Sequence, residues 1–90
     1  MSRITDRLFR INDQLDRLRE ETRLVAEELR MHEHLDDDAR RDAAVGGPLE
    51  RDDARMTAGD VARFRKNLTD LEKKSHRLEA KRERLLRRLG

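Results

Sequence analysis

The sequence predicts an all-α fold: an antiparallel two-helix coiled-coil hairpin, dimerising with a second copy into a four-helix bundle. Three observations predict it. Of the 90 residues, 47% are charged and only 34% hydrophobic, which is too little apolar surface for a broad globular core. Apolar residues recur at heptad spacing in both halves of the chain. The residues that interrupt helices gather at the midpoint, as Gly46-Gly47-Pro48.

Composition and charge exclude several classes of protein. The chain has no Cys, which excludes a disulfide scaffold and a Cys-based zinc site. No apolar run is as long as a membrane span or a signal peptide, so we expect a cytoplasmic protein. The net charge of +2 hides an asymmetry. Residues 31–60 hold four basic and nine acidic side chains, and residues 61–90 hold eleven basic and four acidic ones.

The first helix is expected from about residue 3 to about residue 36. Its seam positions alternate in spacing between four and three residues: Ile4, Leu8, Ile11, Leu15, Leu18, Thr22, Val25, Leu29 and His32. Disordered segments do not hold such a phase over four heptads, so the pattern favours a coiled-coil helix.

The second helix is expected from about residue 58 to about residue 89. Its seam positions keep the same spacing: Val61, Phe64, Leu68, Leu71, Ser75, Leu78, Arg82, Leu85 and Leu89. Thr57 is followed at the third position by Asp60, which resembles a helix N-cap. The polar seam residues of both helices are interpreted as tolerated layers or as layers that specify the register.

An antiparallel register follows when residues whose numbers add to 93 are paired, because the mirror point then falls between Gly46 and Gly47. Flanking charges give a partial test of this register. It predicts attractive pairs between Arg19 and Glu72, between Glu21 and Lys74, and between Glu33 and Arg65. It also places Arg7 near Lys81 and Arg88, so positive charge is concentrated at the open end of the hairpin, where the termini meet.

The connection between the helices is expected over residues 37–56, and it is acidic. Connections of this length are usually functional or disordered. Alternatively, interspersed apolar residues let both helices continue to Gly46-Gly47, with Pro48 at a helix start. The tip is either a solvated loop or a partner-binding surface formed by Asp36, Asp37, Asp38, Asp42, Glu50, Asp52 and Asp53.

Two further surfaces are candidates. The basic open end would attract phosphates of nucleic acid or of a membrane surface, or it is a solvated face. Its residues are Arg3, Arg7, Arg10, Lys81, Arg84, Arg87 and Arg88. An isolated two-helix hairpin is marginally stable, so the off-seam stripe of Leu24, Met31 and Leu35 is expected to dock a second copy or a different protein.

Catalysis and metal binding are not expected. Ser75 and His76 are adjacent and so point to different helix faces. His32 and Asp36 stand four apart, but such pairs are common by chance. The first helix also repeats Arg3-x-x-Asp6, Arg10-x-x-Asp13 and Arg17-x-x-Glu20. An Arg and a carboxylate at this spacing could read a guanine edge, although ordinary ion pairs explain the repeat equally.

These observations predict a non-enzymatic interaction or regulatory protein without a cofactor, presenting its acidic tip to a larger protein such as transcription machinery. The alternatives are nucleic-acid binding through the basic open end and a purely structural dimerisation module. A hairpin with an acidic tip is similar in shape to the coiled-coil finger of transcription factors that enter the secondary channel of bacterial RNA polymerase. The likeness is one of shape alone and assigns no family.

Overall fold

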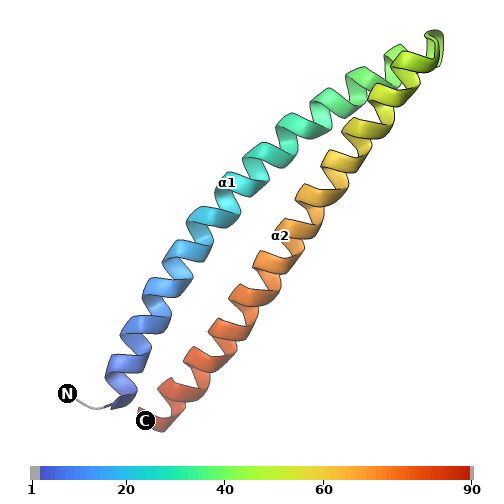
Figure 1. Cartoon of the computed structure of the whole chain (residues 1–90). Helices are drawn as coiled ribbons and strands as arrows, with labels where there is room; N and C mark the ends of the chain where they lie inside the picture. The colour runs from blue at the N-terminus through green and yellow to red at the C-terminus, as the bar shows by residue number, and fades with distance from the viewer. Residues whose placement is uncertain (1–2, 90) are drawn as a thin grey trace. The chain divides into compact units, whose positions relative to one another are not determined.

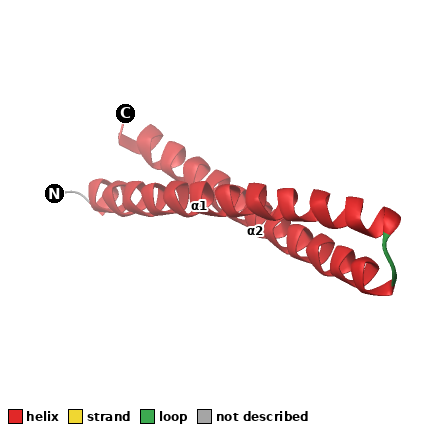
Figure 2. Cartoon of the chain, turned by 90° about the horizontal axis from the view of Figure 1, so that it is seen from above, coloured by secondary structure: helices red, strands yellow, loops and turns green. Residues whose placement is uncertain are grey.

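The computed structural model describes residues 3–89 and confirms the helical hairpin. Helix α1 spans Arg3–Val45 and helix α2 spans Pro48–Leu89, and only Gly46 and Gly47 lie between them (Figure 1). Coloured by secondary structure, these described residues consist of the two helices and this one short loop (Figure 2). The all-α prediction is therefore confirmed.

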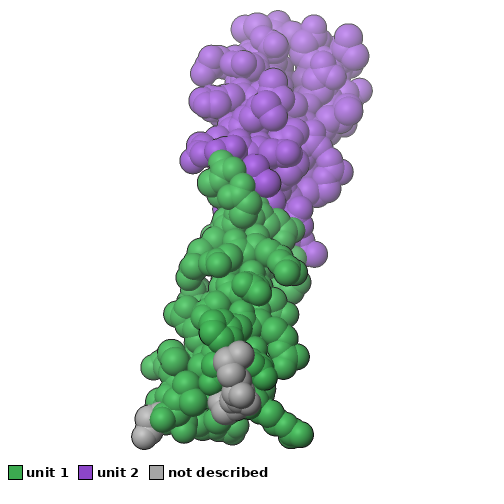
Figure 3. All heavy atoms as spheres, turned by 90° about the vertical axis from the view of Figure 1, so that its left-hand side faces the viewer, with its two compact units in different colours: residues 1–23, 69–90 green, residues 24–68 purple. Residues whose placement is uncertain are grey.

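The hairpin divides into two compact units, shown in green and purple in Figure 3. We call the first the base unit; it combines residues 1–23 with residues 69–90. The second, the tip unit, comprises residues 24–68 and includes the turn. Each unit contains one segment of α1 and one of α2.

The core of the base unit is a seam of leucine and isoleucine side chains. Leu8, Ile11, Leu15 and Leu85 form the buried cluster, and Ile4 and Leu78 pack against it. Leu15 is only 1% exposed. The cluster contains both members of two predicted layers, Leu8 with Leu85 and Leu15 with Leu78, which agrees with the predicted register in this unit.

The tip unit keeps the same register. The Arg65 guanidinium lies 3.3 Å from the Glu33 carboxylate, as predicted. The His32 ring stacks on Phe64 with 4.5 Å between ring centroids. Towards the turn, the less exposed positions continue the heptad spacing on both helices: Asp36, Ala39 and Ala43 on α1, and Glu50, Ala54 and Thr57 on α2. The numbers of their opposed members again add to 93, so the seam extends to the turn.

The predicted connection over residues 37–56 is wrong, because both helices continue through it. The short side chains of Ala39, Ala43 and Ala54 occupy seam positions in this segment, and alanine has the highest helix propensity. Charged residues between them pair within single helical turns, as Arg41 does with Asp38 and Arg55 with Asp52. The alternative, in which the helices continue to Gly46-Gly47 with Pro48 at a helix start, is confirmed.

The start of α2 is therefore capped at Gly47 and not at Thr57, which lies inside the helix. The backbone N–H of Gly47 donates to Glu50 Oε2 over 2.8 Å, and the Gly47 carbonyl accepts from the N–H of Arg51. This is the glutamate half of a capping box, with Pro48 at the first helical position. The chain packs closely here: a Cβ atom on Gly46 would lie 2.7 Å from the carbonyl oxygen of Asp42.

Candidate functional site

An open groove of about 350 Å³ lies between the two helices of the tip unit. We call it the acidic groove. Its apolar and neutral lining comes from Leu35, Ala39, Met56 and Thr57. Its other lining residues are all carboxylates: Asp38, Asp42, Glu50, Asp53 and Asp60. No Lys or Arg of the described chain lines this groove, so it combines an apolar surface with a lining that is negatively charged.

The carboxylates of the acidic groove differ in their partners. Asp38 pairs with Arg41 at 3.5 Å, and Asp60 pairs with Arg63, in each case three residues further along the same helix. Asp42 and Asp53 form no ion pair with any residue in 3–89. These two carboxylates are exposed and free to meet a cation from another molecule.

A buried polar layer adjoins the acidic groove. Asp36 is only 3% exposed and occupies the seam, where Thr57 Oγ1 donates to its Oδ1 over 2.9 Å. The Arg40 guanidinium lies 2.7 Å from its other oxygen. Both oxygens of Asp36 are thus satisfied within the unit. Asp36 was predicted at the presented tip, and this prediction is wrong because Asp36 is buried in the packed seam.

The remaining predicted tip residues divide into two groups. Asp38, Asp42, Glu50 and Asp53 line the acidic groove, whereas Asp37 and Asp52 are exposed and lie outside its lining. Sequence reasoning missed Asp60, which it assigned to the start of the second helix. The available signal was the heptad, since Asp60 lies seven residues after Asp53 and therefore on the same helix face.

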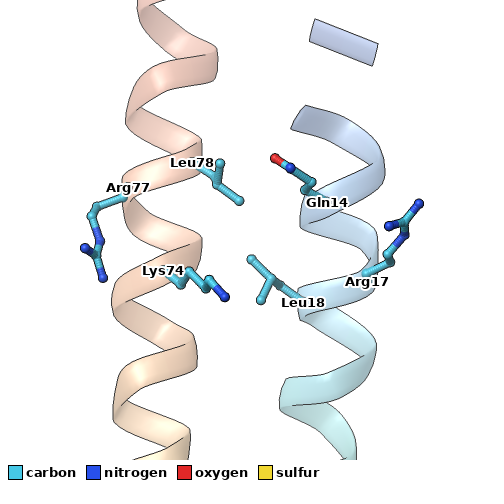
Figure 4. Close-up of a pocket in the computed structure, with 6 residues that line it drawn as sticks. All are labelled: Gln14, Arg17, Leu18, Lys74, Arg77 and Leu78. Atoms are coloured by element: carbon cyan, nitrogen blue, oxygen red, sulfur yellow. The ribbon is translucent and has the colours of Figure 1, made fainter. Parts of the chain in front are cut away.

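A second groove lies between the helices of the base unit. It consists of two adjoining hollows of about 430 and 190 Å³ that share Gln14. We call it the basic groove, and its residues are Arg7, Arg10, Ile11, Gln14, Arg17, Leu18, Lys74, Arg77, Leu78 and Lys81. Figure 4 shows Leu18 and Leu78 pointing into the space between the helices, with Arg17 and Arg77 on the outer sides of their helices.

The basic groove contains six cationic side chains and no carboxylate. None of the six forms an ion pair with another described residue; Arg77 donates only to the backbone carbonyl of Lys73, over 3.4 Å. By contrast, Arg40, Arg41 and Arg55 of the tip unit are all paired with nearby aspartates. The positive charge of the basic groove is therefore not neutralised within the unit.

The predicted basic open end overlaps this groove in part. Arg7, Arg10 and Lys81 line it, with Arg7 and Lys81 in one hollow as the register predicts. Arg3, Arg84, Arg87 and Arg88 are exposed outside it. The prediction of the basic open end did not include Arg17, Lys74 and Arg77, although all three line the groove. It grouped cations by their closeness to the chain ends, whereas these three share the groove through their c and g heptad positions.

The Arg-x-x-acid repeats do not form internal pairs. Arg10 and Arg17 make no ion pair in the described chain, and the pairs that form run from carboxylate to arginine: Asp16 with Arg19 at 3.1 Å and Glu20 with Arg23 at 2.6 Å. Arg19 thus bonds to Asp16 on its own helix, and it lines the same hollow as Glu72, near which the register placed it. Guanine binding by the repeats stays a prediction.

The predicted docking stripe is exposed. Leu24, Met31 and Leu35 are 48%, 55% and 51% exposed, and Leu35 also lines the acidic groove. Within residues 3–89, no group of three or more His, Asp or Glu side chains is placed to hold a metal ion. Neither helix, over the same residues, has a stretch apolar and long enough to cross a membrane.

Comparison with protein-family models, with curated proteins and with solved structures gave no match to this chain.

Proposed function

We propose that this chain is a non-enzymatic protein-binding module whose acidic groove receives a basic amphipathic helix. One observation carries the proposal: an apolar surface at Leu35 and Met56 is bordered by five carboxylates and by no cation. A helix with leucine-like side chains on one face and Lys or Arg beside them matches both features.

In helix-in-groove recognition, apolar contacts and charged contacts contribute differently to binding. Apolar side chains of the incoming helix would cover Leu35 and Met56 and remove their surface from water, which supplies affinity. Cations beside that face would meet Asp42 and Asp53, which supply orientation and speed of association. Since these carboxylates are exposed, the electrostatic part weakens as salt screens it.

A model peptide tests this proposal. The probe is a synthetic helical peptide of leucine and lysine in amphipathic order, with a leucine–glutamate peptide of the same pattern for comparison. Binding of the labelled lysine peptide is measured by fluorescence anisotropy at about 0.15 M salt. The protein is expected to bind the lysine peptide and not the glutamate peptide.

Two matched variants localise the binding. Asp42→Lys/Asp53→Lys replaces two of the five carboxylates that line the groove by cations and should raise the peptide Kd by at least about tenfold. Asp37→Lys/Asp52→Lys makes the same change of net charge outside the groove and should leave the Kd within about twofold. Equal weakening by both variants would show that general charge, and not the groove, binds the peptide.

The basic groove favours nucleic-acid binding as a second candidate function, because its six cations are unpaired. A labelled DNA duplex serves as the probe. Arg17→Gln/Lys74→Gln/Arg77→Gln should reduce the slope of log Kd against log salt by about 2–3, since each phosphate contact contributes about 0.9. An unchanged slope, or absence of binding at low salt, would exclude this candidate.

A further inference from the structure

We infer that a second copy of this chain docks its basic groove on the acidic groove, so that the protein self-associates in antiparallel orientation. The inference rests on the proposed function, because it names an occupant for the same groove. It differs in that the occupant is supplied by the chain itself and is a pair of helices rather than a single one.

The two grooves are built on the same heptad positions. With the seam residues at a and d, Leu35 and Asp42 of α1 occupy g and Asp38 occupies c, while Asp53 and Asp60 of α2 occupy g and Met56 occupies c. The basic groove uses the same letters: Arg7 and Gln14 at g and Arg10 and Arg17 at c on α1, with Lys74 and Lys81 at g and Arg77 at c on α2. The two grooves thus use the same heptad positions and carry opposite charge.

Charge complementarity extends from the grooves to the units that hold them. The tip unit contains eight basic and eleven acidic side chains, a net charge of −3. The base unit contains fourteen basic and nine acidic side chains, a net charge of +5. Tip against base is therefore attractive between copies, whereas tip against tip and base against base are repulsive.

Apolar surface is available on both sides of the proposed contact. Leu35 and Met56 of the acidic groove would meet Leu78 of the basic groove, which is half-buried between the helices. Leu24 and Met31 are exposed at c positions of α1, and they extend the apolar surface on the helix that carries both grooves. Packing one pair of helices on another is the usual way for a two-helix seam to gain a second core.

Two-fold symmetry doubles the contact. In an antiparallel pair, the tip unit of each copy meets the base unit of the other, so the same surface is used by both copies. A pair that makes both contacts closes at two chains. A partner helix that enters the acidic groove must displace the second copy, so self-association competes with partner binding.

A charge-swap experiment tests the pairing. The measurement is the mass by size-exclusion chromatography with light scattering, for a chain of 10.7 kDa. The wild type should have a two-chain mass at about 0.15 M salt and approach the one-chain mass at about 1 M salt. Asp42→Lys/Asp53→Lys and Arg7→Glu/Lys81→Glu should each shift the mass to one chain, with helicity retained by circular dichroism.

Mixing the two variants tests directly whether the basic groove of one copy pairs with the acidic groove of another. Each variant keeps one native groove, so a mixed pair brings a native basic groove to a native acidic groove, and an equimolar mixture should recover a two-chain mass. Native mass spectrometry should identify it as the heterodimer. The control, Asp37→Lys/Asp52→Lys, should remain a dimer. A monomeric wild type, dimeric groove variants, or a mixture of two helical variants that stays monomeric would each overturn the inference.

A peptide titration separates this inference from the proposed function. Arg7→Glu/Lys81→Glu leaves the acidic groove intact and removes its competitor, so it should bind the leucine–lysine peptide more tightly than the wild type does. Peptide binding by a monomeric wild type would overturn self-association and leave the proposed function standing. If the wild type is a salt-sensitive dimer but the Arg7→Glu/Lys81→Glu variant does not bind the peptide, the proposed function is overturned instead.

Discussion

Thr57 Oγ1 lies 2.9 Å from Asp36 Oδ1, joining residues 21 positions apart across the seam of the tip unit. The hydroxyl is also 3.0 Å from the carbonyl oxygen of Ala54. Asp36 has its second oxygen on Arg40, so the buried carboxylate has no unsatisfied oxygen. Because a buried polar residue is tolerated only opposite its partner, this layer favours one register over slipped alternatives.

Removing one member of this layer should cost more than removing both. Thr57→Val deletes the donor in a similar shape and should lower the free energy of unfolding by about 1–3 kcal/mol, because the carboxylate stays buried with one partner fewer. The double variant Asp36→Leu/Thr57→Val replaces the layer by apolar contacts and should recover most of that loss. Urea unfolding followed by circular dichroism measures both. A double variant as unstable as the sum of its single variants would contradict the buried layer.

Two glycines should respond to alanine in opposite directions. At Gly46 the added Cβ would lie 2.7 Å from the Asp42 carbonyl oxygen and 2.6 Å from Glu50 Cγ, so Gly46→Ala should lower the midpoint of thermal unfolding. At Gly59, inside α2, no atom lies within 4 Å of the added Cβ. Gly59→Ala should therefore stabilise the protein by about 0.5–1 kcal/mol through helix propensity. Equal responses would show that the turn is not packed as described.

Leucine truncations should distinguish the seam from the surface. Leu15 is 1% exposed within the core of the base unit, and Leu15→Ala should destabilise the fold by about 2–5 kcal/mol or abolish a cooperative transition. Leu86 lies on the same unit but is 50% exposed, and Leu86→Ala should change the stability by about 0.5 kcal/mol or less. Chemical unfolding of the two variants side by side makes the comparison. A larger loss at Leu86 would place the seam on a different helix face.

The seam was predictable from the sequence because its long apolar residues hold one phase. All seven buried hydrophobic residues of the described chain, from Leu8 to Leu85, fall on positions that the heptad identified. The register was predictable for a second reason, since only one mirror point places Gly46-Gly47 at the turn and Glu33 beside Arg65.

The last heptads before the turn were not predictable from hydrophobicity. There the seam consists of Asp36, Ala39 and Ala43 facing Thr57, Ala54 and Glu50, which resembles an acidic loop in composition. In this segment few large apolar residues occupy the seam. The helices are stabilised instead by packing of small side chains and by the buried carboxylate of Asp36, which is bonded to Thr57 and Arg40. The predicted helix cap at Thr57 is wrong, because Thr57 lies inside α2 and its hydroxyl donates to Asp36 across the seam.

The two grooves were only partly predictable. Their charges were visible in the sequence, but the residues were grouped by position along the chain. This grouping assigned Asp37 and Asp52 to the acidic site and left out Asp60, and it left Arg17 out of the basic site. Grouping by heptad position separates them, because c and g residues of both helices meet on one side of an antiparallel pair.

The fold-back of the chain, on which both grooves depend, is tested most directly by one distance. The chain has no Cys, so Asn12→Cys/Glu79→Cys places two spin labels on exposed positions of the base unit, 67 residues apart. Labelled protein is diluted with unlabelled protein, and the distance is measured by pulsed electron resonance. Packed helix axes lie about 8–10 Å apart, so the labels should be within roughly 20 Å of each other. A distance near 100 Å, which 67 residues of uninterrupted helix would span at about 1.5 Å per residue, would contradict the account.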